Sequence, residues 1–193
     1  LLGSGQMESA LLDQYAIVGE LALDGSTRPT KGALSIAIAA AEGANLRGLV
    51  VPTASAAEAA VVEGIDVIAV ASLSQAVGFL AGEIEIEPTP SRLDDLFRKL
   101  STYDIDFADV RGQEMAKRAL CVAAAGGHNI LMLGPPGSGK TMLAKRVPTI
   151  LPDLTSSESI ETTRIYSALG RLKPGEPLLA TRPFRPPHHT ISD

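Results

Sequence analysis

The sequence predicts an α/β protein made of two units. Between residues 15 and 81, short β-branched runs alternate with alanine-rich helical stretches, a pattern typical of a mostly parallel sheet covered by helices. Further along, a glycine-rich loop at residues 134–141 stands between a short apolar run and a helical stretch. With 193 residues, 45% of them hydrophobic, the chain is long and apolar enough for one or two packed cores.

The elements of the first unit, assigned to residues 1–82, follow from hydrophobic runs and turn residues. Apolar and partly β-branched stretches predict strands at residues 15–23, 47–52 and 66–70. The turn sequence Asp24-Gly25-Ser26 ends the first strand. Runs rich in Ala, Leu and Ile predict helices over residues 31–44, 55–63 and 72–81.

A linker at residues 83–104 separates this unit from the second, residues 105–193. Acidic residues alternate with Ile from Glu83 before a Pro-Thr-Pro sequence, which indicates a linker or an edge strand, and a helix is expected over residues 91–100. In the second unit we expect a strand at 129–133 and helices at 112–125, 141–146 and 155–169. The last of these helices begins with the capping box Thr155-Ser156-Ser157-Glu158.

The glycine-rich loop carries the strongest functional signal. Its residues, which match the G-x-x-x-x-G-K-[ST] pattern of a phosphate-binding loop, are Gly134, Pro135, Pro136, Gly137, Ser138, Gly139, Lys140 and Thr141. Glycine lets the backbone curl round a phosphate with its N–H groups inward, a geometry that a Cβ at Gly137 or Gly139 would obstruct. The start of a helix also favours negative charge.

The loop therefore predicts binding of ATP or GTP with Mg²⁺, with all eight residues at the nucleotide. Lys140 is placed to reach the β- and γ-phosphates, and the Thr141 hydroxyl to bind the metal ion, so both are candidate catalytic residues. The alternative is an ordinary Gly/Pro turn before a helix.

Composition favours a cytoplasmic protein. No apolar run has the length of a membrane span, and no secretion signal is recognisable. The single Cys121 excludes a disulfide framework and is interpreted as a small core residue of a helix. Residues 1–100 hold 6 basic and 13 acidic side chains, whereas residues 101–193 hold 11 and 9, so contact with a polyanion is expected in the second half.

Several motifs together resemble a known family. They are Phe107-Ala108-Asp109-Val110-Arg111-Gly112-Gln113 with the helix after it, Gly126-Gly127-His128-Asn129, the phosphate loop, and the stretch from Pro183 to Ser192. This combination looks like the magnesium-chelatase-like AAA+ ATPases of the YifB/ComM competence-protein family. Residues 15–80, including Gly19-Glu20-Leu21-Ala22-Leu23-Asp24-Gly25, resemble the C-terminal part of the Lon-protease-like domain that precedes the ATPase module in that family.

The resemblance implies a fold and an activity. Residues 1–82 would be part of a Lon-protease-like domain, and residues 105–193 the N-terminal portion of a P-loop AAA+ domain. The full-length protein would hydrolyse ATP as a hexameric ring motor acting on DNA, in branch migration during natural transformation. Val110 and Gly112 match a segment that lies beside the adenine, so they would touch the base, mostly through backbone; the alternative is an ordinary helix start.

Departures from the family are also informative. An apolar strand ending in Asp-Glu, a polar sensor residue and an arginine finger are not identifiable, so we expect these 193 residues to bind ATP but hydrolyse it slowly. We also expect the chain, which starts at Leu1, to be a piece of a longer polypeptide. Ile36 occupies the position of the catalytic lysine of the Lon proteases, which predicts that the first unit has no peptidase activity.

The adjacent pair His188-His189 does not fit a metal site. Adjacent side chains point apart in a strand, and three His and one Cys cannot complete a zinc site with familiar spacing. With Arg182 and Arg185 the pair forms a basic stretch, either a functional loop or a proline-stiffened surface segment. Two other functions stay open: a magnesium-chelatase motor subunit that drives metal insertion into a porphyrin, and a nucleotide-binding fragment without motor activity.

Overall fold

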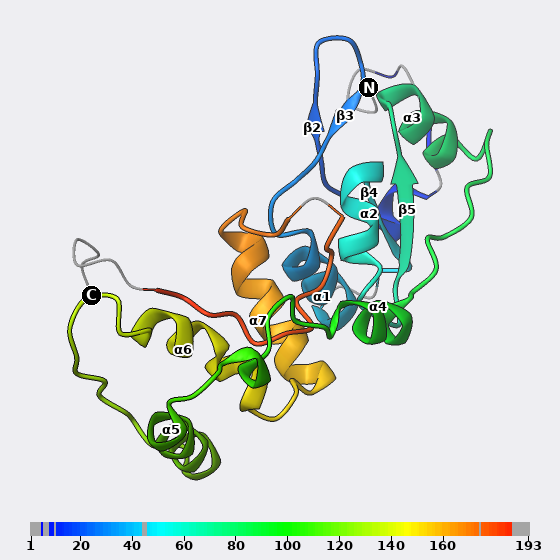
Figure 1. The fold of residues 1–193 in the computed structure, drawn as a ribbon. Helices are drawn as coiled ribbons and strands as arrows, with labels where there is room; N and C mark the ends of the chain where they lie inside the picture. Colours follow the sequence, from blue (N-terminus) through cyan, green and yellow to red (C-terminus); the bar gives the residue numbers. More distant parts are fainter. Residues whose placement is uncertain (1–4, 6–7, 10, 44–45, 174, 187–193) are drawn as a thin grey trace.

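Fully buried apolar residues build the centre of the first unit. The structure, a computed structural model, describes residues 5, 8–9, 11–43, 46–173 and 175–186. Strand β4 (Gly48–Pro52) is buried along its whole length and lies between β1 (Tyr15–Ile17) and β5 (Asp66–Val70), parallel to both. The parallel sheet with its helices confirms the α/β class (Figure 1).

Helices cover both faces of this sheet, because side chains alternate between the faces along each strand. On one face, Leu49 and Val51 pack with helices α1 (Ala33–Gly43) and α2 (Thr53–Ala59). On the other face, Val50 and residues of β5 pack with α3 (Leu73–Ala81), and the rings of Tyr15 and Phe79 meet edge to face with centroids 5.2 Å apart. The first unit is therefore a three-layer sandwich.

The first predicted strand, residues 15–23, is wrong in extent. The chain forms the short helical turn η1 (Leu12–Gln14) and β1, and then a separate antiparallel hairpin of β2 (Glu20–Leu21) and β3 (Thr27–Arg28). The predicted turn at Asp24 is confirmed: its Oδ1 accepts hydrogen bonds from the Ser26 hydroxyl at 2.6 Å and the Ser26 N–H at 3.0 Å. These hydrogen bonds lower the pKa of the Asp24 carboxyl, and the bond from the Ser26 hydroxyl has the larger effect.

In the described part of the linker and second unit, the regular elements are all helices. Residues 83–92 form neither helix nor strand, which excludes the edge-strand alternative for the stretch after Glu83. The helices, including the short 3₁₀ turns η2 and η3, are α4 (Leu93–Leu100), η2 (Phe107–Asp109), α5 (Glu114–Gly126), α6 (Lys140–Arg146), η3 (Val147–Ile150) and α7 (Ser156–Ala168). In the described part of the chain, none of the helices is both long and apolar enough to cross a membrane.

The helix predictions hold to within two residues at most ends. The exception is α2, which ends at Ala59 instead of residue 63, because the chain turns there to reach β5. The capping box of α7 is confirmed in both directions: the Thr155 hydroxyl accepts from the Glu158 N–H at 3.2 Å, and the Glu158 carboxylate accepts from the Thr155 N–H at 2.9 Å.

The strand predicted at residues 129–133 is wrong. The segment is not assigned as a strand, and Leu131 and Leu133 are 80% and 86% exposed. A strand requires a neighbour that pairs with its backbone groups, and every strand among the described residues belongs to the first unit. The apolar run before the phosphate loop is therefore unpaired among the described residues, and most of it is exposed.

The interpretation of Cys121 as a core residue is also wrong. The residue is exposed, and of the residues of α5 only Leu120 is buried. Met115 and Val122 of the same helix are 84% and 61% exposed. Helix α5 therefore presents most of its apolar side chains to solvent.

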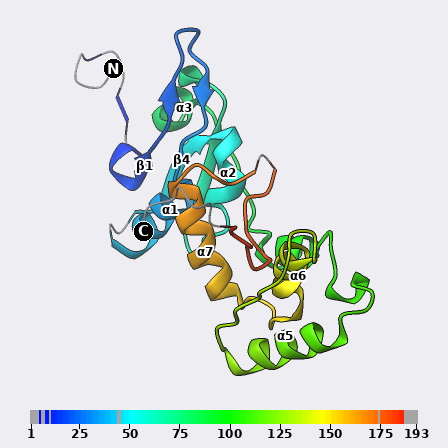
Figure 2. The ribbon, with the colours of Figure 1, turned by 60° about the vertical axis from the view of Figure 1, so that its left-hand side comes forward.

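The two units pack against each other through a shared apolar cluster. Its centre consists of Leu34 from α1, Val61 after α2 and Leu178 after α7, none more than 1% exposed. Helix α4 packs against the same cluster, and α7 lies beside α1 in both views (Figures 1 and 2). At the edge of the cluster, the Glu58 carboxylate accepts hydrogen bonds from the Leu34 N–H at 2.9 Å and from the Ser167 hydroxyl. The boundaries at residues 82 and 104 stay a prediction.

Candidate functional site

The phosphate loop leads directly into α6. Gly137 and Gly139 adopt left-handed backbone angles, with φ of 78° and 83°, and the Ser138 N–H donates to the Pro135 carbonyl at 3.3 Å. Helix α6 starts at the next residue, Lys140. The loop and helix of the expected strand–loop–helix arrangement are thus formed, and the strand is not.

Three glycines in the loop either leave room for a neighbouring side chain or hold a backbone angle that other residues rarely adopt. A Cβ at Gly134 would lie 3.0 Å from the Ser138 Oγ, and one at Gly139 would lie 3.1 Å from the Gln113 Nε2. At Gly137 nothing lies within 4 Å of an added Cβ, so glycine is required there by the positive φ. The expected obstruction is therefore conformational at Gly137, and both steric and conformational at Gly139, whose φ is 83°.

The Lys140 side chain folds back over the loop. Its Nζ donates to the carbonyl oxygens of Gly134 and Pro135, each at 2.8 Å, and to the Ser138 Oγ at 3.2 Å. The ammonium group is thereby held above the backbone that the motif assigns to phosphate. Thr141 follows at the first turn of α6 and is exposed, so its hydroxyl is accessible to a metal ion.

Residues 106–113, named here the base-side segment after the role that the resemblance implies, contact the loop through Gln113, whose Nε2 donates to the Ser138 carbonyl at 3.3 Å. The side chains of Phe107 and Val110 are buried with Leu120 of α5 and Leu143 of α6. Since Val110 is only 3% exposed and its N–H donates to the Phe107 carbonyl at 3.2 Å, its side chain belongs to the core. Gly112 is exposed and has a φ of 68°.

Two residues not predicted as site residues, Arg146 at the end of α6 and Thr149 in η3, attach this segment to the chain after the phosphate loop. The Arg146 Nε donates to the Asp106 carbonyl at 2.9 Å, and its guanidinium lies 3.9 Å from the Asp109 carboxylate. The Thr149 hydroxyl accepts from the Phe107 N–H at 3.1 Å. Because these contacts join positions about 40 residues apart, local sequence patterns gave no signal for them.

The basic stretch near the end of the chain is only partly described. Arg182 Nε donates to the Pro152 carbonyl at 2.7 Å, and its guanidinium lies 3.5 Å from the Glu158 carboxylate, so this cation fixes the start of α7. Arg185 is exposed, and His188 and His189 lie outside the described residues. Within the described part of the chain, no group of three or more His, Cys, Asp or Glu side chains is arranged to hold a metal ion.

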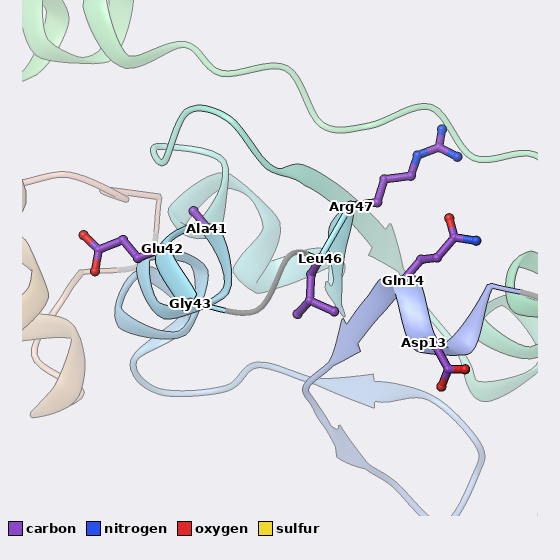
Figure 3. Close-up of a pocket in the computed structure, with 7 residues that line it drawn as sticks. All are labelled: Asp13, Gln14, Ala41, Glu42, Gly43, Leu46 and Arg47. Carbon is purple, nitrogen blue, oxygen red and sulfur yellow. The ribbon is translucent and has the colours of Figure 1, made fainter.

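Two hollows elsewhere add no reactive group to the site. One, of about 570 Å³, is bordered by η1, the end of α1 and the start of β4; its carboxylates Asp13 and Glu42 point away from each other, as Figure 3 shows. Arg47 at its edge pairs with Asp66 at 3.4 Å. The other, of about 900 Å³, lies where the chain before α1, helix α2 and the chain after α7 meet, and its lining includes Thr30, whose Oγ1 is buried without a partner in the described chain.

The sequence is similar to one protein family and to individual bacterial proteins. Residues 106–193 match the family "Magnesium chelatase, subunit ChlI", and residues 1–55 match "Subunit ChlI of Mg-chelatase". Uncharacterized protein Rv2897c of Mycobacterium tuberculosis is 42% identical over 181 residues, which cover 94% of this chain and 35% of that protein.

Two further relatives match the chain over its whole length. Uncharacterized protein YifB of Escherichia coli (strain K12) is 40% identical over 192 residues, and competence protein ComM of Haemophilus influenzae is 37% identical over 193 residues. Each match covers 100% of this chain and 37% of the relative, so the chain spans little more than a third of the length of these proteins. The chain belongs to the magnesium-chelatase-like family of AAA+-type ATPases that includes YifB and ComM.

Proposed function

We propose that residues 105–193 are the nucleotide-binding start of an AAA+ ATPase module that binds Mg·ATP. The observation that carries this proposal is the phosphate loop: two left-handed glycines, a tight turn and a lysine whose ammonium group lies over the loop. An incoming phosphate would take over the Lys140 ammonium from the carbonyls of Gly134 and Pro135. Bound Mg²⁺ would neutralise phosphate charge, and the exposed Thr141 hydroxyl is suited to hold it.

A thermal-shift titration with Mg·ATP tests this function. A ligand at 100 times its Kd stabilises the folded state by about 2.7 kcal/mol, so saturating Mg·ATP raises the melting temperature of the wild type. Lys140→Ala removes the cation over the loop and should abolish most of this rise. Lys145→Ala is the matched control, because Lys145 is an exposed cation on the same helix. Equal rises in the wild type and Lys140→Ala would contradict the proposal.

We propose that the first unit, residues 1–82, is part of a Lon-protease-like domain without proteolytic activity. Ile36, at the position of the catalytic lysine of the Lon proteases, packs against the apolar core of the α1–α2 face. Stoichiometric labelling of this unit by a serine-reactive probe would contradict the assignment.

At the level of the whole protein, we propose a hexameric ring motor that acts on DNA in the cytoplasm. The support is the similarity to competence protein ComM over the whole chain. A magnesium-chelatase motor subunit is the second candidate, favoured by the two family matches. A branched-DNA remodelling assay and a porphyrin metal-insertion assay on the full-length protein separate the two. If the protein is active in neither assay, the third candidate, a nucleotide-binding protein without motor activity, is favoured.

Residues 1–193 should hydrolyse ATP slowly. An arginine finger alone contributes about 10³ to 10⁵ in rate, and no candidate for it is identifiable in this sequence. A steady-state assay that gave about 1 turnover per second or more would contradict this expectation.

A further inference from the structure

Gln113 has an unusual backbone conformation at the point where the base-side segment meets α5. Among the described residues it is the only one other than glycine with a positive φ, at 54°, and it follows Gly112, whose φ is 68°. A residue with a long side chain rarely adopts the left-handed region, because its Cβ crowds the following carbonyl. Such a conformation persists only where surrounding contacts hold it, and it is a reason to look for a function.

The start of α5 does not account for this conformation. Gln113 is the N-cap residue of the helix, and its carbonyl accepts from the Lys117 N–H at 2.9 Å. Typical N-cap residues have extended backbone angles and a short side chain that accepts a hydrogen bond from the first turn. Gln113 has neither, and its side chain makes no capping hydrogen bond.

The side chain instead reaches the phosphate loop. The Gln113 Nε2 donates to the Ser138 carbonyl at 3.3 Å, across 25 positions of sequence. The same nitrogen would lie 3.1 Å from a Cβ at Gly139, a tight approach, so the absence of a side chain at position 139 leaves room for the amide group. The left-handed backbone of Gln113 thus coincides with a side-chain contact to the phosphate loop.

This contact fixes the direction of a loop N–H group. The peptide bond between Ser138 and Gly139 is planar and trans, so its carbonyl and its N–H point in opposite directions. When Gln113 holds the Ser138 carbonyl, it also fixes the Gly139 N–H, which then points away from Gln113. Arg146 at the end of α6 and Thr149 in η3 hold the other end of the base-side segment, outside the loop.

We propose that Gln113 is a positioning residue that orients the phosphate loop for the polyphosphate of the nucleotide and couples the loop to the base-side segment. This inference rests on the proposed binding of Mg·ATP. Without the amide donor, the Ser138–Gly139 peptide is free to rotate. Binding of a polyphosphate must then order this peptide, which weakens the affinity. The loss should appear in the affinity for phosphate-bearing ligands rather than in the stability of the free protein.

The test measures Kd for Mg·ATP and for Mg·tripolyphosphate by calorimetry on three variants. Gln113→Gly keeps the left-handed backbone and removes the amide, whereas Gln113→Glu keeps the length and cannot donate. Gln113→Gly should raise both Kd values about 3- to 10-fold, the effect of one lost hydrogen bond, and Gln113→Glu should raise them at least as much because it also brings a negative charge to the loop. Met115→Ala, an exposed residue on the first turn of α5, should leave both values unchanged.

The outcomes separate this inference from the function on which it rests. If the wild type does not bind Mg·ATP, the proposed function fails and the inference with it. If the wild type binds and Gln113→Gly binds within about 2-fold of it, only the inference fails. A purely structural role would lower the ligand-free melting temperature of Gln113→Gly and leave its Kd values at the wild-type level, which would also overturn the proposal.

Discussion

The two units of this chain handle apolar surface in opposite ways. In the first unit, β4 is buried on both faces and flanked by parallel neighbours, so its apolar residues are covered. In the second unit, the apolar run at residues 129–133 has no strand beside it within the described chain, and Leu131 and Leu133 are largely exposed. The phosphate loop, which carries the candidate site, follows this exposed run. The unit that supplies most of the packed core is thus not the unit that carries the candidate site.

Removing matched leucines from the two regions should give the largest contrast. Leu49→Ala truncates a fully buried side chain in β4 and should lower the free energy of unfolding by about 2–5 kcal/mol. Leu133→Ala truncates a side chain that is 86% exposed and should change it by less than about 0.5 kcal/mol. Urea denaturation followed by far-UV circular dichroism measures both values. Similar losses for the two variants would mean that residues 129–133 are packed in solution.

The same contrast explains which parts of the fold local sequence patterns could predict. Strands β4 and β5 and most helices were predicted because a buried apolar run or a helical stripe is a local signal. The strand at 129–133 was predicted wrongly from the same kind of signal, because pairing depends on a neighbour elsewhere in the chain. Cys121 was assigned to the core from its place on a helix, but only the packing of that helix decides which side is covered.

The candidate site shows the same division. The phosphate loop is a contiguous motif, so its residues and its left-handed glycines could be read directly. The contacts of Gln113, Arg146 and Thr149 join positions 25 to 42 residues apart, so composition and spacing did not indicate them. Residues 107–113 are recognisable as a motif in the sequence, but their hydrogen bond to the loop, from Gln113 to Ser138, is seen only in the structure.

The contact between the units offers the next largest effect. Glu58 belongs to α2, and its carboxylate accepts from the N–H of Leu34 in α1 and from the hydroxyl of Ser167 in α7. Glu58→Ala leaves both donors without this acceptor and should lower the free energy of unfolding by about 1.5–3 kcal/mol. Ser167→Ala removes only the hydrogen bond from the Ser167 hydroxyl to Glu58 and should lower the free energy of unfolding by less.

Calorimetry of these two variants tests whether the units unfold as one body. If the shared cluster around Leu178 joins them, both variants should show one transition shifted to lower temperature. A split into two transitions in Ser167→Ala would instead show that this hydroxyl and carboxylate are essential to the joint unfolding.

The smallest expected effect is on the pH dependence of stability, and it concerns one exposed carboxylate in each unit, Asp24 and Glu158. Hydrogen bonds from the Ser26 hydroxyl and then the Ser26 N–H lower the pKa of Asp24 in the hairpin turn. The Thr155 N–H is the main cause that lowers the pKa of Glu158 at the start of α7, with a smaller contribution from Arg182. A carboxyl with a lowered pKa in the folded state holds its proton less tightly there than in the unfolded chain. Each therefore stabilises the fold above its ordinary pKa, about 3.9 for Asp and 4.3 for Glu, and this stabilisation is lost as the pH falls through the lowered value.

Asp24→Asn and Glu158→Gln should thus be slightly less stable than the wild type at pH 7, and the difference should shrink below about pH 4. Urea unfolding at pH 7, 5, 4 and 3 measures this difference, and a difference that persists unchanged to pH 3 would contradict the assigned cause.

The two substitutions should differ in their dependence on salt. Glu158 faces the Arg182 guanidinium at 3.5 Å, whereas the hydrogen bonds that lower the pKa of Asp24 come from neutral groups. Raising the ionic strength to about 1 M should therefore reduce the effect of Glu158→Gln and leave that of Asp24→Asn nearly unchanged, because salt screens the ion pair and not short hydrogen bonds between neighbouring residues.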